Sequence, residues 1–319
     1  MTKPMVYVTR QVANEAIAML EAVADVEVWA EDRPIPRDVL LQKAEEASAL
    51  LTMLTERIDE ELLMRAKRLR IVANMAVGYD NIDVAAAKRH GVIVTNTPDV
   101  LTEATADLAF ALLMAAGRRL VEANRFLLAG GWTSWNPHLM VGQNIYGATL
   151  GIVGMGRIGQ AVARRAAGFG MRILYHNRSR RPDAERTTGA QYAPFDELLR
   201  ESDYVVLLTP LTEETRNLMG EREFSLMKPT AVFVNVSRGG TVDEAALYRA
   251  LVDKQIWAAG LDVFQQEPVP LDNPLLSLPN VVALPHIGSA TYQTRLEMAR
   301  LAAANIAAVL SGEEPVTPV

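Results

Sequence analysis

Three charged side chains stand at or just beyond the ends of separate apolar segments. Arg238 follows "AVFVNV", Glu267 lies in the loop after "AAGLDVF", and His286 follows "VVALP". Ligands of open α/β sheets bind beyond the carboxyl ends of strands, so these residues are placed to meet one substrate. Arg can bind a carboxylate and polarise a ketone oxygen, His can protonate that oxygen as a hydride arrives, and Glu can stabilise the imidazolium. The set predicts reduction of a 2-oxo acid; three unrelated surface residues are the alternative.

The other three of the four histidines are less well placed for this chemistry. His90 precedes Gly91 at the end of a helical pattern, a common structural position for a cation. His138 lies in a loop rich in Gly and Trp, where exposure is expected. His176 ends a strand near the expected nucleotide, at the wrong end for redox chemistry. His286 is therefore the candidate proton donor.

A glycine-rich turn carries the clearest local signal. The segment "TLGIVGMGRIGQAVARRAA" has Gly154, Gly156 and Gly159 in the spacing G-x-G-x-x-G, between an apolar run and a helical pattern. This context is what a dinucleotide fingerprint requires. The first glycine permits the tight turn, the second lets a pyrophosphate approach the backbone, and the third lets the helix pack on the strand. A turn without a ligand is the alternative, but the flanking pattern favours dinucleotide binding.

The stretch "HNRSRR" stands where a ribose-binding acid is expected, ~18 residues beyond the third glycine. Asn177 replaces the acid, and Arg178, Ser179 and Arg180 follow it. An acid would repel a 2′-phosphate, whereas Arg can pair with one and Ser can donate a hydrogen bond to it. The substitution predicts NADP(H) rather than NAD(H). A solvated basic turn is the alternative.

Apolar runs alternate with helical patterns along most of the chain, which predicts parallel sheets with right-handed crossovers. One series of strands is expected from "MVYVT" to "GVIVTN" and a second from "ATLGIVGMG" to "VVALPH". An apolar-rich helix is expected between them, over about Thr102 to Ala129. A last helix, about Thr291 to Leu310, is expected to return to the first series. The pattern predicts an α/β protein with two doubly wound domains, the first of them discontinuous.

Composition narrows the classes of function. The 319 residues are 50% hydrophobic and 22% charged, which suffices for two ordinary domains with their own cores. The net charge of -6 argues against non-specific nucleic-acid binding, because phosphates must be neutralised by Lys and Arg. The absence of cysteine excludes disulfides and thiol nucleophiles. The longest apolar stretch, "LAFALLMAAG", is shorter than the ~20 residues of a membrane span. A soluble cytoplasmic protein with no metal, membrane or nucleic-acid partner is expected.

The chain resembles the D-isomer-specific 2-hydroxyacid dehydrogenase family over nearly its whole length. The resemblance is carried by "NMAVGYDNID", "NTPDVLTEATADLAFALLMAAGRR", "GIVGMGRIG", "NVSRGG", "GLDVFQQEP" and "LPHIGSAT". Within the family, "VGYDNID", "NTPDVLTEATAD" and "PHIGSAT" are most similar to the glyoxylate/hydroxypyruvate reductases. The resemblance implies NADPH-dependent reduction of glyoxylate or hydroxypyruvate to glycolate or D-glycerate.

The resemblance also implies an architecture. A Rossmann domain that binds NADP, residues 100–286, would be inserted in a flavodoxin-like substrate domain formed by residues 1–99 and 287–319, with the active site in the cleft. The enzyme would be a homodimer, in which the helix after Thr102 and the Trp-containing loop belong to the interface. Trp135 would be lent to the neighbouring subunit's substrate pocket.

Single residues take roles from the same resemblance. Arg238, Glu267 and His286 would be the catalytic trio. The backbone N–H groups of Val77 and Gly78 would bind the substrate carboxylate together with Arg238, as a glycine there lets an anion approach the main chain.

Ser289 would add a polar substrate contact, and Asp262 would orient the nicotinamide carboxamide. The expected cofactor contacts are Thr105, Gly154, Met155, Gly156, Arg157, Ile158, Gly159, Asn177, Arg178, Ser179, Arg180, Val236, Ser237, Asp262 and Gly288.

Two kinds of alternative remain open. Another family member could act on 2-ketogluconate, phosphoglycerate, formate or phosphite. A phosphorylated substrate would need extra cations near Val77, and "LLTMLTERID" offers only Arg57 there. A nucleotide-sensing, corepressor-like binding protein could use the same fold, but it would not need the Arg–Glu–His set.

Overall fold

The computed structural model describes residues 3–319, which divide into two compact units. The first unit contains the chain up to Leu101 together with Ser289–Val319, and the second contains Thr102–Gly288. Both boundaries fall two residues later than the sequence suggested. The reason at the second boundary is a pair of hydrogen bonds, because the N–H groups of Ile287 and Gly288 donate to the carboxylate of Asp262 and tie both residues to the second unit.

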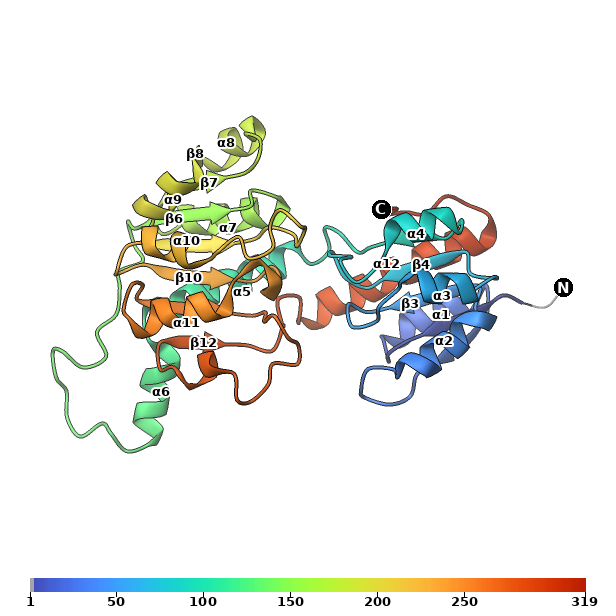
Figure 1. The fold of residues 1–319 in the computed structure, drawn as a ribbon, viewed down its shortest axis with the longest axis horizontal. Coiled ribbons are helices and arrows are strands. Elements are labelled where there is room, and N and C mark those ends of the chain that lie inside the picture. Colours follow the sequence, from blue (N-terminus) through green and yellow to red (C-terminus); the bar gives the residue numbers. More distant parts are fainter. Residues whose placement is uncertain (1–2) are drawn as a thin grey trace. The chain divides into compact units, whose positions relative to one another are not determined.

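The first unit is built on a five-stranded parallel sheet (Figure 1). The strand order is β2-β1-β3-β4-β5, which is the flavodoxin-like doubly wound order. The strands are β1 Met5–Val8, β2 Asp25–Val28, β3 Ala49–Thr52, β4 Ile71–Asn74 and β5 Ile93–Thr95. The helices are α1 Asn14–Glu21, α2 Arg37–Glu46, α3 Glu60–Arg65, α4 Val84–Arg89 and α12 Tyr292–Ser311.

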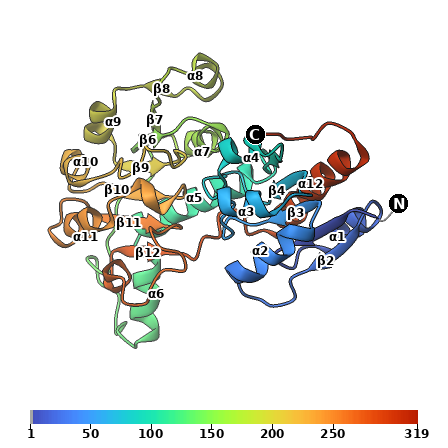
Figure 2. The same cartoon turned by 45° about the vertical axis from the view of Figure 1, so that its right-hand side comes forward.

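Helices cover both faces of this sheet, so its central strands are buried throughout. All four residues of β3 and of β4 are buried, which is typical of a parallel sheet between two helical layers. The C-terminal helix α12 packs on α1 and against β3 and β4, with Met298, Ala302 and Ile306 buried (Figure 2). The expected return of the last helix to the first series of strands is confirmed.

The second unit contains a seven-stranded parallel sheet in the order β12-β11-β10-β9-β6-β7-β8. Counted from β6, this is the Rossmann order with one strand added at the far edge. The strands are β6 Thr149–Val153, β7 Arg172–His176, β8 Gln191–Tyr192, β9 Tyr204–Leu207, β10 Val232–Asn235, β11 Ala258–Leu261 and β12 Val281–Ala283. The helices are α5 Thr102–Gly117, α6 Leu120–Leu128, α7 Arg157–Ala167, α8 Pro182–Thr188, α9 Phe195–Glu201, α10 Glu221–Leu226 and α11 Glu244–Val252, with 3-10 turns at Gly239–Thr241 and Pro274–Ser277. The predicted α/β class with two doubly wound parallel sheets is confirmed.

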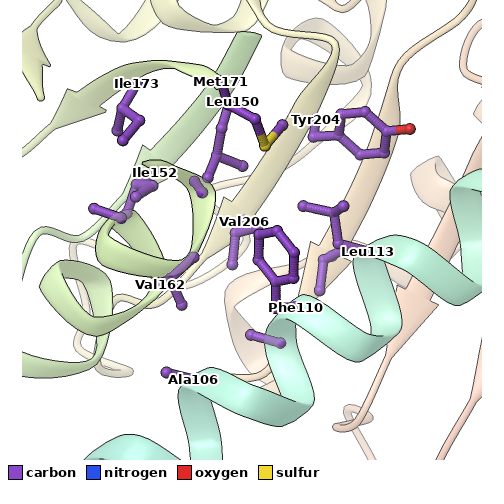
Figure 3. Close-up of a cluster of buried hydrophobic side chains, with 14 of the residues drawn as sticks. Ala106, Phe110, Leu113, Leu150, Ile152, Val162, Met171, Ile173, Tyr204 and Val206 are labelled. Atoms are coloured by element: carbon purple, nitrogen blue, oxygen red, sulfur yellow. The ribbon is translucent and has the colours of Figure 1, made fainter. Parts of the chain in front are cut away.

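Helix α5 forms one face of the core in the second unit. Its Phe110 and Leu113 pack toward Leu150, Ile152 and Val206 of the sheet (Figure 3). These side chains are almost completely buried. Burial of each large apolar side chain contributes roughly 1.5–3 kcal/mol, so this contact anchors the helix that carries Thr105.

The predicted helix from Thr102 to Ala129 is wrong as a single element. It consists of α5 and α6, separated at Arg119, which has a left-handed backbone with φ of 55°. A Cβ atom at Gly117 would lie 2.7 Å from the Tyr204 hydroxyl, so the end of α5 lies close to the sheet. The continuous apolar pattern hid this break. The two-residue edge strand β8 was also not predicted, because two residues carry no periodic signal.

Helix α6 differs from the other long helices because none of its residues is buried. Figures 1 and 2 show α6 and the loop after it standing away from the sheet of the second unit.

Within residues 3–319, every helix falls short of the length or the apolar character that a membrane span requires.

Candidate active site

His286 and Glu267 form a short ion-pair contact at the carboxyl end of the sheet in the second unit. Their Nδ1 and Oε2 atoms are 2.6 Å apart. The two side chains keep 25% and 29% of their accessible surface, so they are sheltered yet still reachable. Because Nδ1 is held by the carboxylate, Nε2 is the ring nitrogen that remains for a substrate.

The backbone of His286 is left-handed, with φ of 54°. This conformation is uncommon outside glycine, and a residue keeps it only where its surroundings hold it. Asp262 provides that support. Its carbonyl accepts from the His286 N–H at 2.9 Å, and its carboxylate oxygens accept from the N–H groups of Ile287 and Gly288 at 2.7 and 2.8 Å. Asp262 thereby fixes the direction of the His286 side chain.

The pKa values of the two acids at this edge, Asp262 and Glu267, are shifted in opposite directions. Burial raises the pKa of Asp262 and outweighs the two backbone hydrogen bonds that lower it. Burial also acts to raise the pKa of Glu267, but hydrogen bonds from His286 and the Phe264 N–H, with the charges of His286 and Arg238, lower it overall. Glu267 therefore stays ionised at neutral pH and can accept a hydrogen bond from the imidazole.

Arg238 is positioned by the tight turn that follows β10. The buried Asn235 donates to the Arg238 carbonyl at 3.1 Å, and the Thr241 hydroxyl donates to it at 2.6 Å. The Arg238 guanidinium donates from Nη1 to the Ser237 carbonyl at 2.9 Å. A Cβ atom at Gly239 would lie 1.8 Å from the carbonyl carbon of Phe264, so only glycine lets this turn pack on the loop that leads to Glu267. The charge of Arg238 also lowers the pKa of Glu267.

The glycine turn has the geometry that a pyrophosphate needs. Gly154 has φ of 108°, and a Cβ there would lie 2.9 Å from the Leu208 backbone. A Cβ at Gly159 would lie 2.4 Å from the Gly154 carbonyl oxygen, so helix α7 packs directly on the turn. Gly156 faces open space and precedes α7 as an N-cap without a side-chain hydrogen bond. The N-terminus of a helix attracts anions, so the start of α7 suits a pyrophosphate, and Met155, Arg157 and Ile158 lie in the same turn.

The arginines in the segment after β7 differ in their exposure and in their partners. Asn177 accepts a hydrogen bond from the Met155 N–H at 2.7 Å, which ties the segment to the glycine turn. Arg180 donates from Nε and Nη2 to both oxygens of Glu185, at 3.0 and 2.8 Å. Arg178 is 90% exposed and lies 4.0 Å from Glu214, the distance of a weak ion pair. Ser179 is also exposed. Arg178 and Ser179 are therefore better placed than Arg180 for a 2′-phosphate.

The first unit contains the segment expected to bind the substrate carboxylate. Its hydrogen bonds use carbonyl groups, because Asn96 donates to the Val77 carbonyl at 2.8 Å and Asn74 donates to the Gly78 carbonyl at 3.0 Å. Within residues 3–319, neither the Val77 N–H nor the Gly78 N–H donates a hydrogen bond to a backbone carbonyl. Both N–H groups are therefore suited to bind an incoming anion. Ser289 is the first residue of the C-terminal part of the same unit and is half-buried.

The other residues predicted to contact cofactor or substrate lie in three segments of the second unit. Thr105 is buried in the first turn of α5, and its side chain lies against the space above Gly288. Val236 and Ser237 follow β10 directly, with the Ser237 hydroxyl donating to Asn235 at 2.8 Å. Trp135 is 79% exposed in the loop after α6.

The other histidines have structural contacts. His90 ends α4 and its Nε2 lies 2.6 Å from Glu60. His176 contacts the Ala193 carbonyl through Nδ1 at 3.0 Å, and the backbone N–H of His138 donates to Asn136. No group of three or more His, Asp or Glu in residues 3–319 is arranged to hold a metal ion.

Two positioning residues escaped the sequence analysis. Asn74 and Asn235 are completely buried and end β4 and β10. Each side-chain amide donates to a backbone carbonyl of the loop that follows its strand, as described above for Gly78 and Arg238. A polar last residue in an otherwise apolar strand, as in "IVAN" and "VFVN", is the signal that could have found them.

Comparisons with known proteins identify the family of the chain. The family model for the NAD binding domain of D-isomer specific 2-hydroxyacid dehydrogenases matches residues 110–288. The glyoxylate reductase of Thermococcus gammatolerans is 55% identical over 321 residues, covering 99% of this chain and 96% of that protein. A glyoxylate reductase structure from Paecilomyes thermophila has a TM-score of 0.89 at 34% identity, covering 100% and 99% of the two chains. An NADPH-dependent glyoxylate/hydroxypyruvate reductase from Sinorhizobium meliloti, solved with NADP and malonate, has a TM-score of 0.85 at 35% identity, covering 100% and 97%.

Proposed function

The chain belongs to the D-isomer specific 2-hydroxyacid dehydrogenases, and on this premise we propose that it reduces glyoxylate and hydroxypyruvate with NADPH, forming glycolate and D-glycerate. The observation that carries the proposal is the His286–Glu267 pair beside Arg238 at the carboxyl end of the sheet. The names of the similar glyoxylate reductases support the choice of substrate.

The proposed mechanism assigns one role to each polar group. A nicotinamide cofactor held at the turn of Gly154, Gly156 and Gly159 would supply a hydride for the carbonyl carbon of the 2-oxo acid. His286 donates a proton from Nε2 to the carbonyl oxygen, so the aldehyde of glyoxylate or the ketone of hydroxypyruvate becomes a hydroxyl group. The ionised Glu267 accepts a hydrogen bond from Nδ1 and keeps the imidazole oriented for that transfer. Asp262 maintains the left-handed backbone that aims the imidazole.

The carboxylate and the developing charge need cationic groups. Arg238 binds the substrate carboxylate and polarises the ketone oxygen, which is the stabilisation that grows toward the transition state. The N–H groups of Val77 and Gly78 bind the same carboxylate, and Ser289 adds a polar contact. These assignments rest on family resemblance and on the loop geometry of each unit.

A substrate panel tests the proposed function. The purified protein is assayed for NADPH oxidation with glyoxylate, hydroxypyruvate and 2-ketogluconate. We expect turnover of the first two with the higher kcat/KM. A dominant activity on 2-ketogluconate would assign the protein to that branch instead. Binding of NADPH without turnover of any 2-oxo acid would favour the nucleotide-sensing alternative.

The preference for NADPH is proposed from Asn177 and the exposed Arg178. Arg178→Ala is expected to lower kcat/KM for NADPH by about 30-fold, because a charge-assisted hydrogen bond to a phosphate contributes roughly 1.5–3 kcal/mol. The value for NADH, which lacks this phosphate, is expected to stay nearly constant. Steady-state kinetics with both cofactors measure the change.

Two neighbouring arginines serve as matched controls for this variant. Arg180→Ala removes a side chain already engaged by Glu185, and Arg181→Ala removes one that precedes Pro182. Both are expected to change the NADPH preference less than Arg178→Ala does. An equal loss with NADPH and NADH in Arg178→Ala would contradict the phosphate contact, and a wild-type preference for NADH would contradict the cofactor assignment.

The homodimer is proposed from the apolar surface of α6 and the loop after it. Leu127, Leu128, Trp132 and Trp135 are each more than half exposed. Soluble proteins rarely leave such clusters in contact with water, and a second copy of the chain is the usual partner. In the dimer we expect Trp135 to reach the partner's substrate pocket.

The double variant Leu127→Glu/Leu128→Glu is expected to sediment as a monomer, because two charges would be buried in the interface. Analytical ultracentrifugation of the variant and the wild-type protein measures the change. Leu271→Glu is the control, since Leu271 is 95% exposed in a different part of the second unit and should leave the dimer intact. A wild-type monomer, or a variant that remains dimeric, would refute this interface.

A further inference from the structure

The first unit contains a crevice that the mechanism above does not use. Its volume is about 940 Å³. Residues 10–13, which follow β1, and residues 53–55, which follow β3, form two of its walls. Met75 after β4 and residues 290–296 around the start of α12 complete it. In the order β2-β1-β3-β4-β5, the ends of β1 and β3 are the topological switch point, where doubly wound sheets bind ligands.

The charged side chains that line the crevice are both arginines, Arg10 and Arg295. The Nη1 atom of Arg10 is buried and has no hydrogen-bond partner within residues 3–319. Its Nη2 atom lies 3.5 Å from Asp32, whose side chain is fully exposed. A solvated acid at that distance neutralises the guanidinium only weakly. The charged side chains on the lining of the crevice are thus cationic, while the carboxylate of the buried Glu56 is hydrogen-bonded to Met53 and Thr55 of the lining.

Two helices add to the positive potential. Ala13 and Thr291, the N-cap residues of α1 and α12, both line the crevice. The N-terminus of a helix carries a partial positive charge, and α1 has no side-chain cap at its N-terminus. Arg295 lies one turn into α12, three residues after Tyr292, so both face the crevice from the same side of the helix.

The walls near the carboxylate-binding segment are held rigidly. The buried Glu56 accepts from the Thr9 hydroxyl at 2.7 Å and from the Met53 N–H at 2.6 Å. Asn81 donates to the carbonyls of Met53 and Glu56 at 3.1 and 2.8 Å. The residues that follow β1 and β3 are thus joined by buried hydrogen bonds, so the crevice is a formed feature of the unit.

Size and position connect the crevice to the substrate. Met75 lies two residues before Val77, and Ala290 follows Ser289, so the crevice adjoins both proposed substrate-binding segments. A volume near 940 Å³ lies at the upper end of the roughly 300–1,000 Å³ of small-molecule sites. Glyoxylate, the smallest 2-oxo acid, has no substituent that could enter it.

We propose that this crevice is a subsite for a second negative charge, and that the substrates include 2-oxo acids with a distal carboxylate or phosphate. The inference rests on the proposed function, because the first carboxylate is held at Val77 and Gly78. The C3 substituent then extends toward Arg10 and Arg295, whose planar guanidinium groups suit a carboxylate or a phosphate equally.

Arg10→Met and Arg295→Met test the subsite with substrates that differ in the tail. Glyoxylate has no tail, pyruvate has a neutral one, oxaloacetate has a carboxylate, and 3-phosphohydroxypyruvate has a phosphate. Each variant is expected to lose about 10- to 100-fold in kcat/KM for the two anionic-tail acids, the value of a hydrogen bond to a charged group. The fold-change with pyruvate is expected to be much smaller. Whichever of oxaloacetate and 3-phosphohydroxypyruvate loses more identifies the anion that the crevice prefers.

Arg57→Met is the matched control, because Arg57 is an exposed arginine of the same unit that does not line the crevice. It should leave the order of substrates unchanged. Equal losses for pyruvate and oxaloacetate in both crevice variants would overturn the proposal, and so would a wild-type enzyme that uses oxaloacetate and 3-phosphohydroxypyruvate no better than pyruvate.

Equilibrium binding separates this inference from the proposed function. Calorimetry with succinate and butyrate, which have equal chain length and different charge, does not require turnover. The wild-type protein should bind succinate more tightly, and Arg10→Met and Arg295→Met should lose that preference. If no 2-oxo acid is reduced but succinate is still preferred, the reductase assignment fails while the anion site stands. If glyoxylate is reduced and succinate is not preferred, the anion site alone fails.

Discussion

His286→Ala is expected to lower kcat for glyoxylate reduction by about a thousandfold, since a positioned general acid contributes roughly 10²–10⁴. The Nδ1 contact to Glu267 at 2.6 Å leaves Nε2 as the proton donor, and an alanine offers no proton. Glu267, whose pKa is lowered, cannot take over because it is ionised at neutral pH. The affinity for NADPH should change little, as none of the glycine-turn contacts involves His286. Single-turnover kinetics and fluorescence titration of NADPH measure the two quantities.

His286→Asn is the control for the backbone at this position. The left-handed φ of 54° suits Asn better than Ala, so this variant keeps the segment fixed by Asp262 while it removes the proton donor. Both variants should therefore lose similar activity. If His286→Asn retained near wild-type turnover, proton donation by His286 would be disproved, and the loss in His286→Ala would reflect a displaced backbone.

The glycine turn was the most predictable part of the site, because its function depends on local sterics. Gly154 has the positive φ, Gly159 packs on the turn, and Gly156 faces open space. These are the three roles that the spacing predicts. The strand order and the two parallel sheets were equally accessible, since alternating apolar runs and helices leave few other topologies.

The features that escaped prediction depend on contacts between distant residues. The break at Arg119 follows from the packing of Gly117 on Tyr204, far along the chain. The pairing of Arg180 with Glu185 likewise has no signal in the sequence, and the predicted contact of Arg180 with the 2′-phosphate stays a prediction.

The crevice lined by Arg10 and Arg295 is another feature that could not be predicted from local sequence patterns. In the sequence, Arg57 is the cation that the segment "LLTMLTERID" places near the carboxylate-binding segment. Arg10 and Arg295 are separated by most of the chain, and they line one crevice because β1 pairs with β3 and α12 returns to this sheet. Topology, and not local spacing, creates this cationic site.

Arg238→Ala is expected to lower kcat/KM for glyoxylate by about a thousandfold, or about 4 kcal/mol at 1.36 kcal/mol for each factor of ten. Roughly a hundredfold should appear in kcat, because polarisation of the aldehyde oxygen strengthens toward the transition state. About tenfold should appear in KM through the lost grip on the carboxylate. The loss also removes a charge that lowers the pKa of Glu267, so that acid becomes easier to protonate. Initial rates over a range of glyoxylate concentrations separate the two parameters.

Arg238→Lys distinguishes the charge from the shape of the guanidinium. Lysine keeps the positive charge but loses the planar fork that can bind a carboxylate and a ketone oxygen together. It should recover KM more than kcat. Recovery of both would show that charge alone suffices, and recovery of neither would assign the effect to the shape of the fork. If Arg238→Ala left both parameters at wild-type values, with the fold intact by thermal unfolding, Arg238 would have no part in the reaction and the substrate would have to be bound at another group. The distinction is meaningful because the backbone carbonyl of Arg238 accepts hydrogen bonds from Asn235 and Thr241, which both variants retain, so the turn is expected to survive the substitution.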